Sequence, residues 1–378
     1  VWRPSSDSRE EAILDAARRT EPPEFFIGDR TLGLPARAYV IAEAGVNHDG
    51  DAAAARSLID AAAEAGADAV KFQVFSADRL ATRQAATAGY QQESAGAASQ
   101  HAMLSGLELD HATFSELAGH AARCGLDFIA TPFSIADLEF LDQLGVAAVK
   151  LASPDIVNVP LLEAAARTNR PVIASTGAAD LNEVADAVAL FDRLECGPLA
   201  LLHCVSSYPT PDDEANLAAI GALSRAFGRT VGFSDHTTSI DMGGYALLAG
   251  ARLIEKHLTL DRDRAGPDHG FSLEPAMMAA YVRHIRQAEA WLGSGDVTPT
   301  PRQREVRRLA RCSIVAACDL TAGQTLERSM LTLKRPGDGV APKHLDRFIG
   351  RRLRVTIAAD TSLSWDMVTD AAPSPTSN

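Results

Sequence analysis

The sequence is short of features that mark several classes of protein. None of its five cysteines (Cys124, Cys196, Cys204, Cys312 and Cys318) forms a CxxC pair or a zinc spacing. No apolar run approaches the length of a membrane span, and no signal-peptide pattern opens the printed chain. Lys and Arg total 36 against 49 Asp and Glu, a formal net charge of −13. We therefore expect a reduced, cytoplasmic protein that binds neither nucleic acid nor a membrane surface.

What the sequence does contain is a series of eight apolar runs, separated by alanine-rich stretches of helical length. The runs are YVIAEAG (39–45), DAVKFQVF (68–75), LDFIATP (126–132), AAVKLAS (147–153), PVIAST (171–176), LALLHCVSS (199–207), TVGFSDH (230–236) and ARLIEKH (251–257). A strand followed by a helix, eight times over, predicts an α/β protein with a (β/α)8 TIM barrel. In that fold the active site lies at the C-terminal ends of the strands. We therefore expect the polar residues that end these runs to form one site: Glu43, Lys71, Gln73, Thr131, Lys150, Ser153, Ser175, His203, Ser206, His236 and His257.

Composition divides the chain into five segments. Residues 1–37 are interpreted as an N-terminal arm followed by a hairpin that could plug the bottom of the barrel. The barrel occupies 38–294, and the Pro- and Gly-containing segment 295–305 is a linker. Residues 306–370 carry short β-type runs and turn signals, which predict a small β-rich domain. The tail, 371–378, is disordered by composition.

Two histidines are suited to a metal. His236 and His257 end the seventh and eighth runs, and adjacent barrel strands bring their ends close together. The two imidazoles could share one divalent ion and leave room for water and substrate, the arrangement of a Lewis-acid site. The alternative is that one or both only donate and accept hydrogen bonds.

Two lysines end the second and fourth runs. A lysine buried on an apolar strand must be paired or functional, because removing its charge from water is costly. Lys71 and Lys150, with hydroxyls such as those of Ser175 and Ser234, could hold a phosphate. Either lysine could instead form a Schiff base, as in class I aldolases, or reach solvent as an ordinary strand-end lysine.

Acidic residues lie on both sides of the barrel seam. Glu43 belongs to the first strand, and Glu255 belongs to the eighth. Strand alternation is taken to point Glu255 away from His257, which favours a salt bridge or a supporting role. The turn-rich loop 261–275 reads as a surface lid from which Asp268 could reach inward. The connection from Ser76 to about Leu109 is also long enough to be functional or mobile.

Taken together, these motifs resemble a known family. AEAGVNHDGD, VKFQ, ATPFS, KLAS, STG, LLHCVSSYPTP, GFSDHT, EKHLTLDRDRAGPDH and KRPGDG, in this order, resemble the bacterial sialic acid synthase family, which includes the legionaminic and pseudaminic acid synthases. The match covers about 25 to 368, and its last part looks like the family's antifreeze-like SAF (β-clip) domain.

The resemblance implies a reaction and a set of roles. Phosphoenolpyruvate (PEP) would condense with the aldehyde of an N-acylated hexosamine to give a nine-carbon 2-keto acid and phosphate. It implies Mn2+ or Mg2+ held by His236 and His257, and an acid, Glu43, near the reacting carbons. The implied PEP contacts are Lys71, Thr131, Lys150, Ser153, Ser175 and Ser234. The implied sugar contacts are Gln73, Asp155, Tyr208, Asp268 and Arg335. The arginine would come from the partner subunit of a domain-swapped homodimer.

Two positions depart from the sialic acid synthase pattern. Asp155 stands where many members carry a glutamate, and Ser206 stands where some carry Asn. VSSYPTP is closer to the wider group that contains the legionaminic and pseudaminic enzymes, so the sugar need not be N-acetylmannosamine. Two rival interpretations remain, a Schiff-base pyruvate aldolase and a non-catalytic sugar-binding protein on the same fold.

Overall fold

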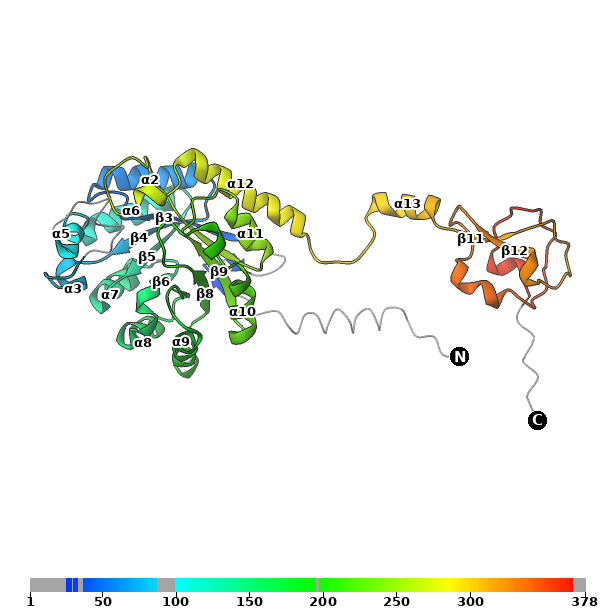
Figure 1. The fold of residues 1–378 in the computed structure, drawn as a ribbon, viewed down its shortest axis with the longest axis horizontal. Helices are drawn as coiled ribbons and strands as arrows, with labels where there is room; N and C mark the ends of the chain where they lie inside the picture. Colours follow the sequence, from blue (N-terminus) through cyan, green and yellow to red (C-terminus); the bar gives the residue numbers. More distant parts are fainter. Residues whose placement is uncertain (1–24, 29, 33–36, 87–98, 195–196, 370–378) are drawn as a thin grey trace. The chain divides into compact units, whose positions relative to one another are not determined.

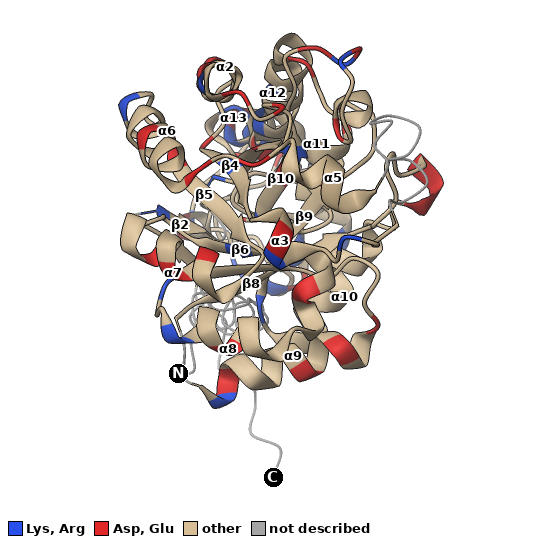
Figure 2. Cartoon of the chain, turned by 90° about the vertical axis from the view of Figure 1, so that its left-hand side faces the viewer, with Lys and Arg blue, Asp and Glu red and all other residues tan. Residues whose placement is uncertain are grey.

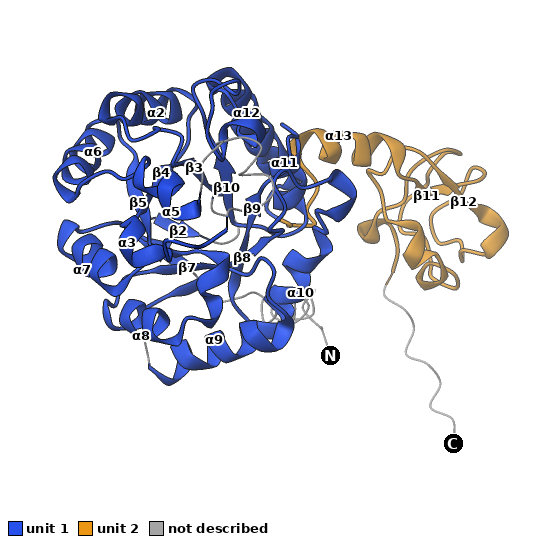
Figure 3. Cartoon of the chain, turned by 60° about the vertical axis from the view of Figure 1, so that its left-hand side comes forward, with its two compact units in different colours: residues 1–294 blue, residues 295–378 orange. Residues whose placement is uncertain are grey.

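The computed structural model describes residues 25–28, 30–32, 37–86, 99–194, 197–369 of the chain. The predicted arm (1–24) and tail (371–378) lie outside these ranges. The chain divides into two compact units, residues 1–294 and 295–378 (Figure 3). Among the described residues, no helix has the length and apolarity needed to cross a bilayer.

The first unit is built around a closed barrel of eight parallel strands, which confirms the predicted TIM barrel (Figure 1). Neighbouring strands pair in chain order, and the last strand, β10, closes the barrel against the first, β3. The strands are β3 (Tyr39–Gly45), β4 (Ala69–Val74), β5 (Asp127–Pro132), β6 (Val149–Leu151), β7 (Val172–Ser175), β8 (Leu199–Cys204), β9 (Thr230–Asp235) and β10 (Leu253–His257). Each lies within one of the apolar runs.

The barrel interior changes from apolar to polar along the strands. Side chains alternate between the two faces of a strand, so Tyr39, Ile41 and Glu43 of β3 face the same way. The lower interior is an apolar cluster that includes Tyr39, Ile41, Ile129, Ile173 and Leu253. A hairpin of β1 (Phe25–Ile27) and β2 (Arg30–Leu32) adds Phe25, Ile27 and Leu32 to this cluster. The predicted plug is therefore present, and polar side chains fill the upper end.

Helices surround the barrel and bury their apolar faces on the outer side of the strands. Several of them begin at residues that suit an N-cap: Asp51, Asp110, Ser134 and Asp180 each accept a backbone N–H of the first turn. Figure 2 shows acidic residues along these outer helices, including α7 and α9. The helices are α2 (Ala52–Glu64), α6 (His111–Arg123), α7 (Ile135–Leu144), α8 (Val159–Arg167), α9 (Leu181–Arg193), α10 (Ala218–Phe227), α11 (Met242–Leu248) and α12 (Pro275–Leu292).

The described part of the long connection after β4 contains two short helices, α3 (Ala77–Leu80) and α5 (Gln100–Ser105). Met103 and Leu107 pack with Val46 and Phe75 into a separate apolar cluster above the barrel. Residues 87–98 of this connection lie outside the described residues. Short 3-10 turns follow other strands at Ser153–Val157, Asp212–Glu214 and His269–Phe271.

The second unit is a small domain with its own core. Strands β11 (Ser313–Ala316) and β12 (Leu331–Lys334) pair antiparallel, and isolated bridges such as Leu320 to Ile357 extend this framework. Buried side chains such as Ile314 and Phe348 form the core. Short 3-10 turns lie at Arg328–Met330, Pro342–Arg347 and Trp365–Met367.

The segment interpreted as a linker, 295–305, contains the first half of a helix, α13 (Pro301–Ala310). Thr300 and Gln303 form a reciprocal capping box, and Pro301 occupies the first turn. These are sequence signals of a helix start. The interpretation of 295–305 as a linker did not use these signals.

Candidate active site

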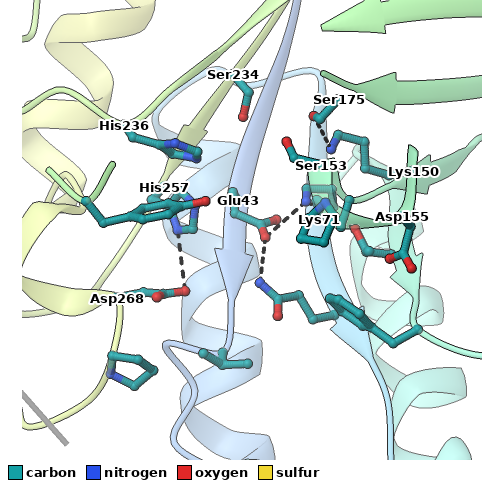
Figure 4. A pocket seen from close by; sticks show the side chains of 18 of the residues that line it. Glu43, Lys71, Lys150, Ser153, Asp155, Ser175, Ser234, His236, His257 and Asp268 are labelled. Carbon is teal, nitrogen blue, oxygen red and sulfur yellow. Dashed lines mark hydrogen bonds and ion pairs between the residues drawn. The ribbon is translucent and has the colours of Figure 1, made fainter. Parts of the chain in front are cut away.

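One pocket opens at the C-terminal end of the barrel, and thirteen of the sixteen expected site residues line it (Figure 4). They come from all eight strands or from the loops that follow them. The thirteen are Glu43, Lys71, Gln73, Thr131, Lys150, Ser153, Asp155, Ser175, Tyr208, Ser234, His236, His257 and Asp268. Strand register explains the grouping, because Glu43 pairs with His257 on one side and with Lys71 on the other.

A buried charge cluster forms the floor of the pocket. The Lys71 Nζ lies 3.0 Å from Glu43 Oε1 and 3.5 Å from Glu255 Oε2. Lys71 also donates to Thr131 Oγ1 at 3.3 Å, and Gln73 Nε2 donates to Glu43 Oε1 at 3.3 Å. Burial opposes the charge on Lys71, but the Glu255 and Glu43 carboxylates outweigh it and hold the lysine pKa above its ordinary value. Lys71 therefore stays cationic.

The orientation of Glu255 differs from the one expected from the sequence. Glu255 does not point away from His257, because residues two apart on a strand share a face, and both line the pocket. The Glu255 Oε2 lies 3.8 Å from Lys150 Nζ, and Oε1 accepts a hydrogen bond from Ser234 at 2.9 Å. Burial opposes its ionisation, but Lys150 and Lys71 hold the carboxyl pKa below its usual range. The predicted salt bridge is present, and it sits at the centre of the site.

Hydroxyl groups surround the second lysine. Lys150 Nζ donates to Ser175 Oγ at 2.7 Å and to the Leu151 carbonyl at 3.2 Å. Ser153 Oγ accepts the Gly177 backbone N–H at 3.0 Å. Burial lowers the pKa of Lys150, which the nearby Glu255 only partly offsets. An anion bound between Lys71 and Lys150 would stabilise the charged form of Lys150, which burial destabilises.

Two imidazoles lie next to this cluster, with ring centroids 5.4 Å apart. The Nδ1 of His236 lies 2.8 Å from the Val205 carbonyl. A carbonyl only accepts, so this nitrogen carries the proton and the Nε2 lone pair is left for a ligand. The Nδ1 of His257 is buried and has no hydrogen-bond partner. Burial holds the pKa of His257 well below its ordinary value, so it is a neutral donor of the kind a metal needs.

This pair of histidines fits a divalent ion with open coordination positions. Asp268 Oδ2 lies 3.7 Å from His257 Nδ1. In the described part of the chain, however, His236, His257 and an acid do not bring one ligand atom each within 4.8 Å of one another. The protein would thus supply two nitrogen ligands, and water or substrate would complete the shell.

The loop after β10 is the second point that differs from the sequence interpretation. The stretch 266–269 is buried rather than a surface lid. His269 is anchored by Thr259 Oγ1 at 2.7 Å and Asp49 Oδ1 at 3.0 Å. Its neighbour Asp268 is thereby held in the pocket, where burial and the nearby Glu43 raise its pKa to about 7.

A glycine makes room for these acids. Gly45 has φ +52°, and a Cβ there would lie 3.2 Å from Glu43 Oε1 and 3.5 Å from Asp268 Oδ2. Any larger residue would be strained and would crowd both carboxyl groups.

Three expected residues lie elsewhere. His203 is buried but does not line the pocket; its Nε2 lies 2.9 Å from the Ala215 carbonyl, and its ring stacks on Phe233. Ser206 is exposed on the loop after β8 and is not among the lining residues. Arg335 is exposed in the second unit. The roles expected of Ser206 and Arg335 stay predictions.

The pocket also has an apolar rim that the sequence did not indicate. It is made by the β4 connection and its neighbours, and its residues are Val46, Leu80, Met103, Leu104, Leu107 and Phe133. Only the unusual length of the 76–109 connection pointed to this region.

Comparison with known proteins agrees with this architecture. The NeuB family model matches residues 58–297, and the SAF domain model matches residues 311–369. N,N'-diacetyllegionaminic acid synthase of Legionella pneumophila is 41% identical over 90% of this chain and 97% of its own length. N-acetylneuraminate-9-phosphate synthase of Mus musculus is 32% identical over 90% and 95%. The crystal structure of an N-acetylneuraminic acid synthetase from Leptospira borgpetersenii, in complex with citrate, superposes with a TM-score of 0.67 and 35% identity, covering 75% of this chain and 95% of that one.

Proposed function

The chain belongs to the NeuB family and carries a SAF domain, and from this and the pocket chemistry we propose the substrates it uses and the residues that act on them. Its relatives are named synthases of nonulosonic acids, so it is a transferase that forms a carbon–carbon bond from PEP. The observation that carries the proposal is the sharing of one pocket by two buried lysines, four hydroxyls and two histidines.

PEP is assigned to the lysine side of the pocket. At neutral pH it carries a carboxylate and a phosphate, and Lys71 and Lys150 are the two cations buried there. The hydroxyls of Thr131, Ser153, Ser175 and Ser234 would donate to the same oxygens. Charge-assisted hydrogen bonds to an anion are each worth about 1.5–3 kcal/mol.

The sugar aldehyde is assigned to the histidine side. His236 and His257 would hold the Mn2+ or Mg2+, which when bound supplies a Lewis acid that polarises the carbonyl. Gln73, Asp155 and Tyr208 line the part of the pocket where sugar hydroxyl and acetamido groups would lie.

The reaction forms a carbon–carbon bond and a bond from a water oxygen to C2, and it cleaves the C–O bond to phosphate. The PEP methylene carbon attacks the aldehyde carbon, and water adds to C2 of the former PEP. The C–O bond to phosphate then breaks, which leaves the 2-keto acid and inorganic phosphate. Burial raises the pKa of Glu43, and Lys71 opposes this rise. When PEP takes over the contact with Lys71, Glu43 can therefore take up a proton and give it to the aldehyde oxygen. The lysines hold the phosphate as its charge grows.

The sugar itself is proposed to be a 2,4-diacetamido-2,4,6-trideoxyhexose. Its C6 methyl and second acetamido methyl suit the apolar rim around Met103 and Phe133, whereas the extra hydroxyls of N-acetylmannosamine would be desolvated there without a partner. The high identity to a diacetyllegionaminic acid synthase supports the same choice.

The second unit is proposed to complete the site in a homodimer. Arg335 is exposed beside β12, and a guanidinium suits a bidentate contact with an amide or hydroxyl oxygen of the sugar. We place it in the partner subunit's barrel.

A substrate panel tests the proposal. Phosphate release from PEP is measured with N-acetylmannosamine, its 6-phosphate and the diacetamido-trideoxyhexoses, with and without Mn2+. The diacetamido sugars should give the highest kcat/KM. Preference for N-acetylmannosamine would refute the assigned sugar while leaving the reaction class intact.

A further inference from the structure

A group of three metal-ligand side chains lies on the outer helices of the barrel. Asp60 belongs to α2, and His120 and Cys124 belong to α6 and its C-terminal cap. None of the three lines the active-site pocket. Cys124 is four positions after His120, so both side chains point the same way from α6, toward the packed helix α2.

The three ligand atoms already lie close together. Asp60 Oδ1 is 2.7 Å from His120 Nε2 and 3.6 Å from Cys124 Sγ. The remaining edge, from Cys124 Sγ to His120 Nε2, is 3.9 Å. This is the one trio among the described residues whose ligand atoms lie within 4.8 Å of one another.

These distances match one face of a tetrahedral zinc site. Zinc bonds of about 2.3 Å to sulfur and about 2.1 Å to nitrogen and oxygen give edges of about 3.6 Å from sulfur and about 3.4 Å between nitrogen and oxygen. The two sulfur edges are within a few tenths of an ångström of this. Only the Asp60 to His120 edge has to open, by about 0.7 Å.

We propose that Asp60, His120 and Cys124 form a second metal site, separate from the catalytic pocket, that binds Zn2+. A thiolate and an imidazole favour zinc over Mn2+ or Mg2+, which prefer oxygen ligands. The fourth position faces water, because the Asp60 side chain is 54% exposed and that of His120 is 21% exposed.

Binding requires small local changes. Arg123 Nη2 lies 3.4 Å from His120 Nδ1. When the metal binds Nε2, the proton of the His120 ring lies on Nδ1. Nδ1 can then no longer accept a hydrogen bond from Arg123, so the exposed Arg123 side chain turns away. Cys124 binds as the thiolate and gives its proton to solvent. The ion would then tie α2 to α6, two helices joined here by the Asp60–His120 contact.

Cobalt and zinc titrations of the full chain test this, in the His236→Ala background so that the pocket histidines do not compete. Co2+ should give the near-ultraviolet charge-transfer absorption of a cobalt–thiolate bond, and one equivalent of Zn2+ should abolish it. Cys124→Ser should remove the band, and Asp60→Asn or His120→Gln should weaken Zn2+ binding at least tenfold. The control Cys318→Ser, at an exposed thiol, should change neither.

Circular dichroism of each variant checks that the fold is retained. In the otherwise native chain, Cys124→Ser should keep full Mn2+-supported activity, because the trio lies outside the pocket. A band that persists in Cys124→Ser, or its absence from the parent chain, would overturn the proposal. So would Zn2+ affinity unchanged in folded Asp60→Asn and His120→Gln.

Discussion

The Lys71 ammonium lies 3.0 Å from the Glu43 carboxylate, and these side chains are only 5% and 1% exposed. Neither charge can be screened by water, so the Lys71 charge is balanced by Glu43 and Glu255. An incoming PEP brings its own negative charge and competes with Glu43 for Lys71. Under the proposed function, substrate binding would therefore free the Glu43 carboxyl group to act as the proton donor.

Substitution of Glu43 should affect PEP binding and turnover differently. Glu43→Gln removes a competitor for Lys71, so the KM for PEP should stay the same or fall. The proton donor is lost, so kcat should drop by about 10^2-fold or more. Steady-state kinetics in both substrates measures the two effects. A raised KM for PEP with unchanged kcat would show that Glu43 holds PEP rather than the proton.

Glu255 should contribute to stability in the absence of PEP. Glu255→Gln leaves Lys71 and Lys150 with less compensation, and breaking a buried pair costs about 3–5 kcal/mol. Urea unfolding measures the loss, and added phosphate should recover part of it. The control is Glu163→Gln, which breaks an exposed pair with Arg167 on α8 and should cost about 0.5 kcal/mol or less. Equal losses for the two variants would contradict the account.

The pH dependence should report on Lys150. Its pKa is lowered from 10.5 by burial, so its positive charge is lost as pH rises through that lowered value. The kcat/KM for PEP should then fall on the alkaline side, below pH 10.5. Lys71 has a raised pKa and stays charged. Lys150→Arg keeps the charge, so the alkaline limb should move to higher pH; an unmoved limb would assign it to another group.

The polar half of the barrel interior was predictable from two rules that need only short stretches of sequence. Side chains alternate between the two faces of a strand, and the active site of a TIM barrel lies at the C-terminal ends of its strands. Glu43, Lys71 and Lys150 follow apolar runs, and the fold alone brings them together. The error at Glu255 came from misapplied alternation, since positions 255 and 257 share a face. The burial of Asp268 was not predictable, because it depends on the anchoring of His269 by Asp49, 220 residues away in the chain.

The apolar rim and the Asp60–His120–Cys124 trio show a second limit. Met103 reaches the pocket only because the β4 connection folds back over the barrel mouth. The trio depends on how two helices are rotated against each other. Apolar periodicity predicts which face of each helix is buried, but it does not predict which polar side chains meet along their common edge.

Metal removal should abolish activity. A chelator should remove the activity, and added Mn2+ should restore it. His236→Ala should lower the rate by about 10^3-fold or more. His284→Ala, on α12 and outside the pocket, is the matched control and should be as active as the parent. Full activity in chelator-treated, metal-free protein would rule out the role assigned to His236 and His257.

Complementation tests the placement of Arg335. Arg335→Ala and Lys150→Ala should each be inactive alone. If each site takes its barrel from one chain and Arg335 from the other, mixing the two variants should restore activity, because the heterodimer has one site with both residues intact. Native mass spectrometry verifies subunit exchange. Exchange without recovered activity would mean that Arg335 serves its own barrel or none.

The central claim is the condensation itself, and product stoichiometry tests it most directly. With Mn2+, PEP and a diacetamido-trideoxyhexose, the account predicts equal amounts of PEP consumed, phosphate released and nine-carbon 2-keto acid formed. No phosphate should appear without the sugar. Keto-acid formation from pyruvate instead of PEP, with borohydride trapping an adduct on Lys150 or Lys71, would contradict the account and establish a Schiff-base aldolase.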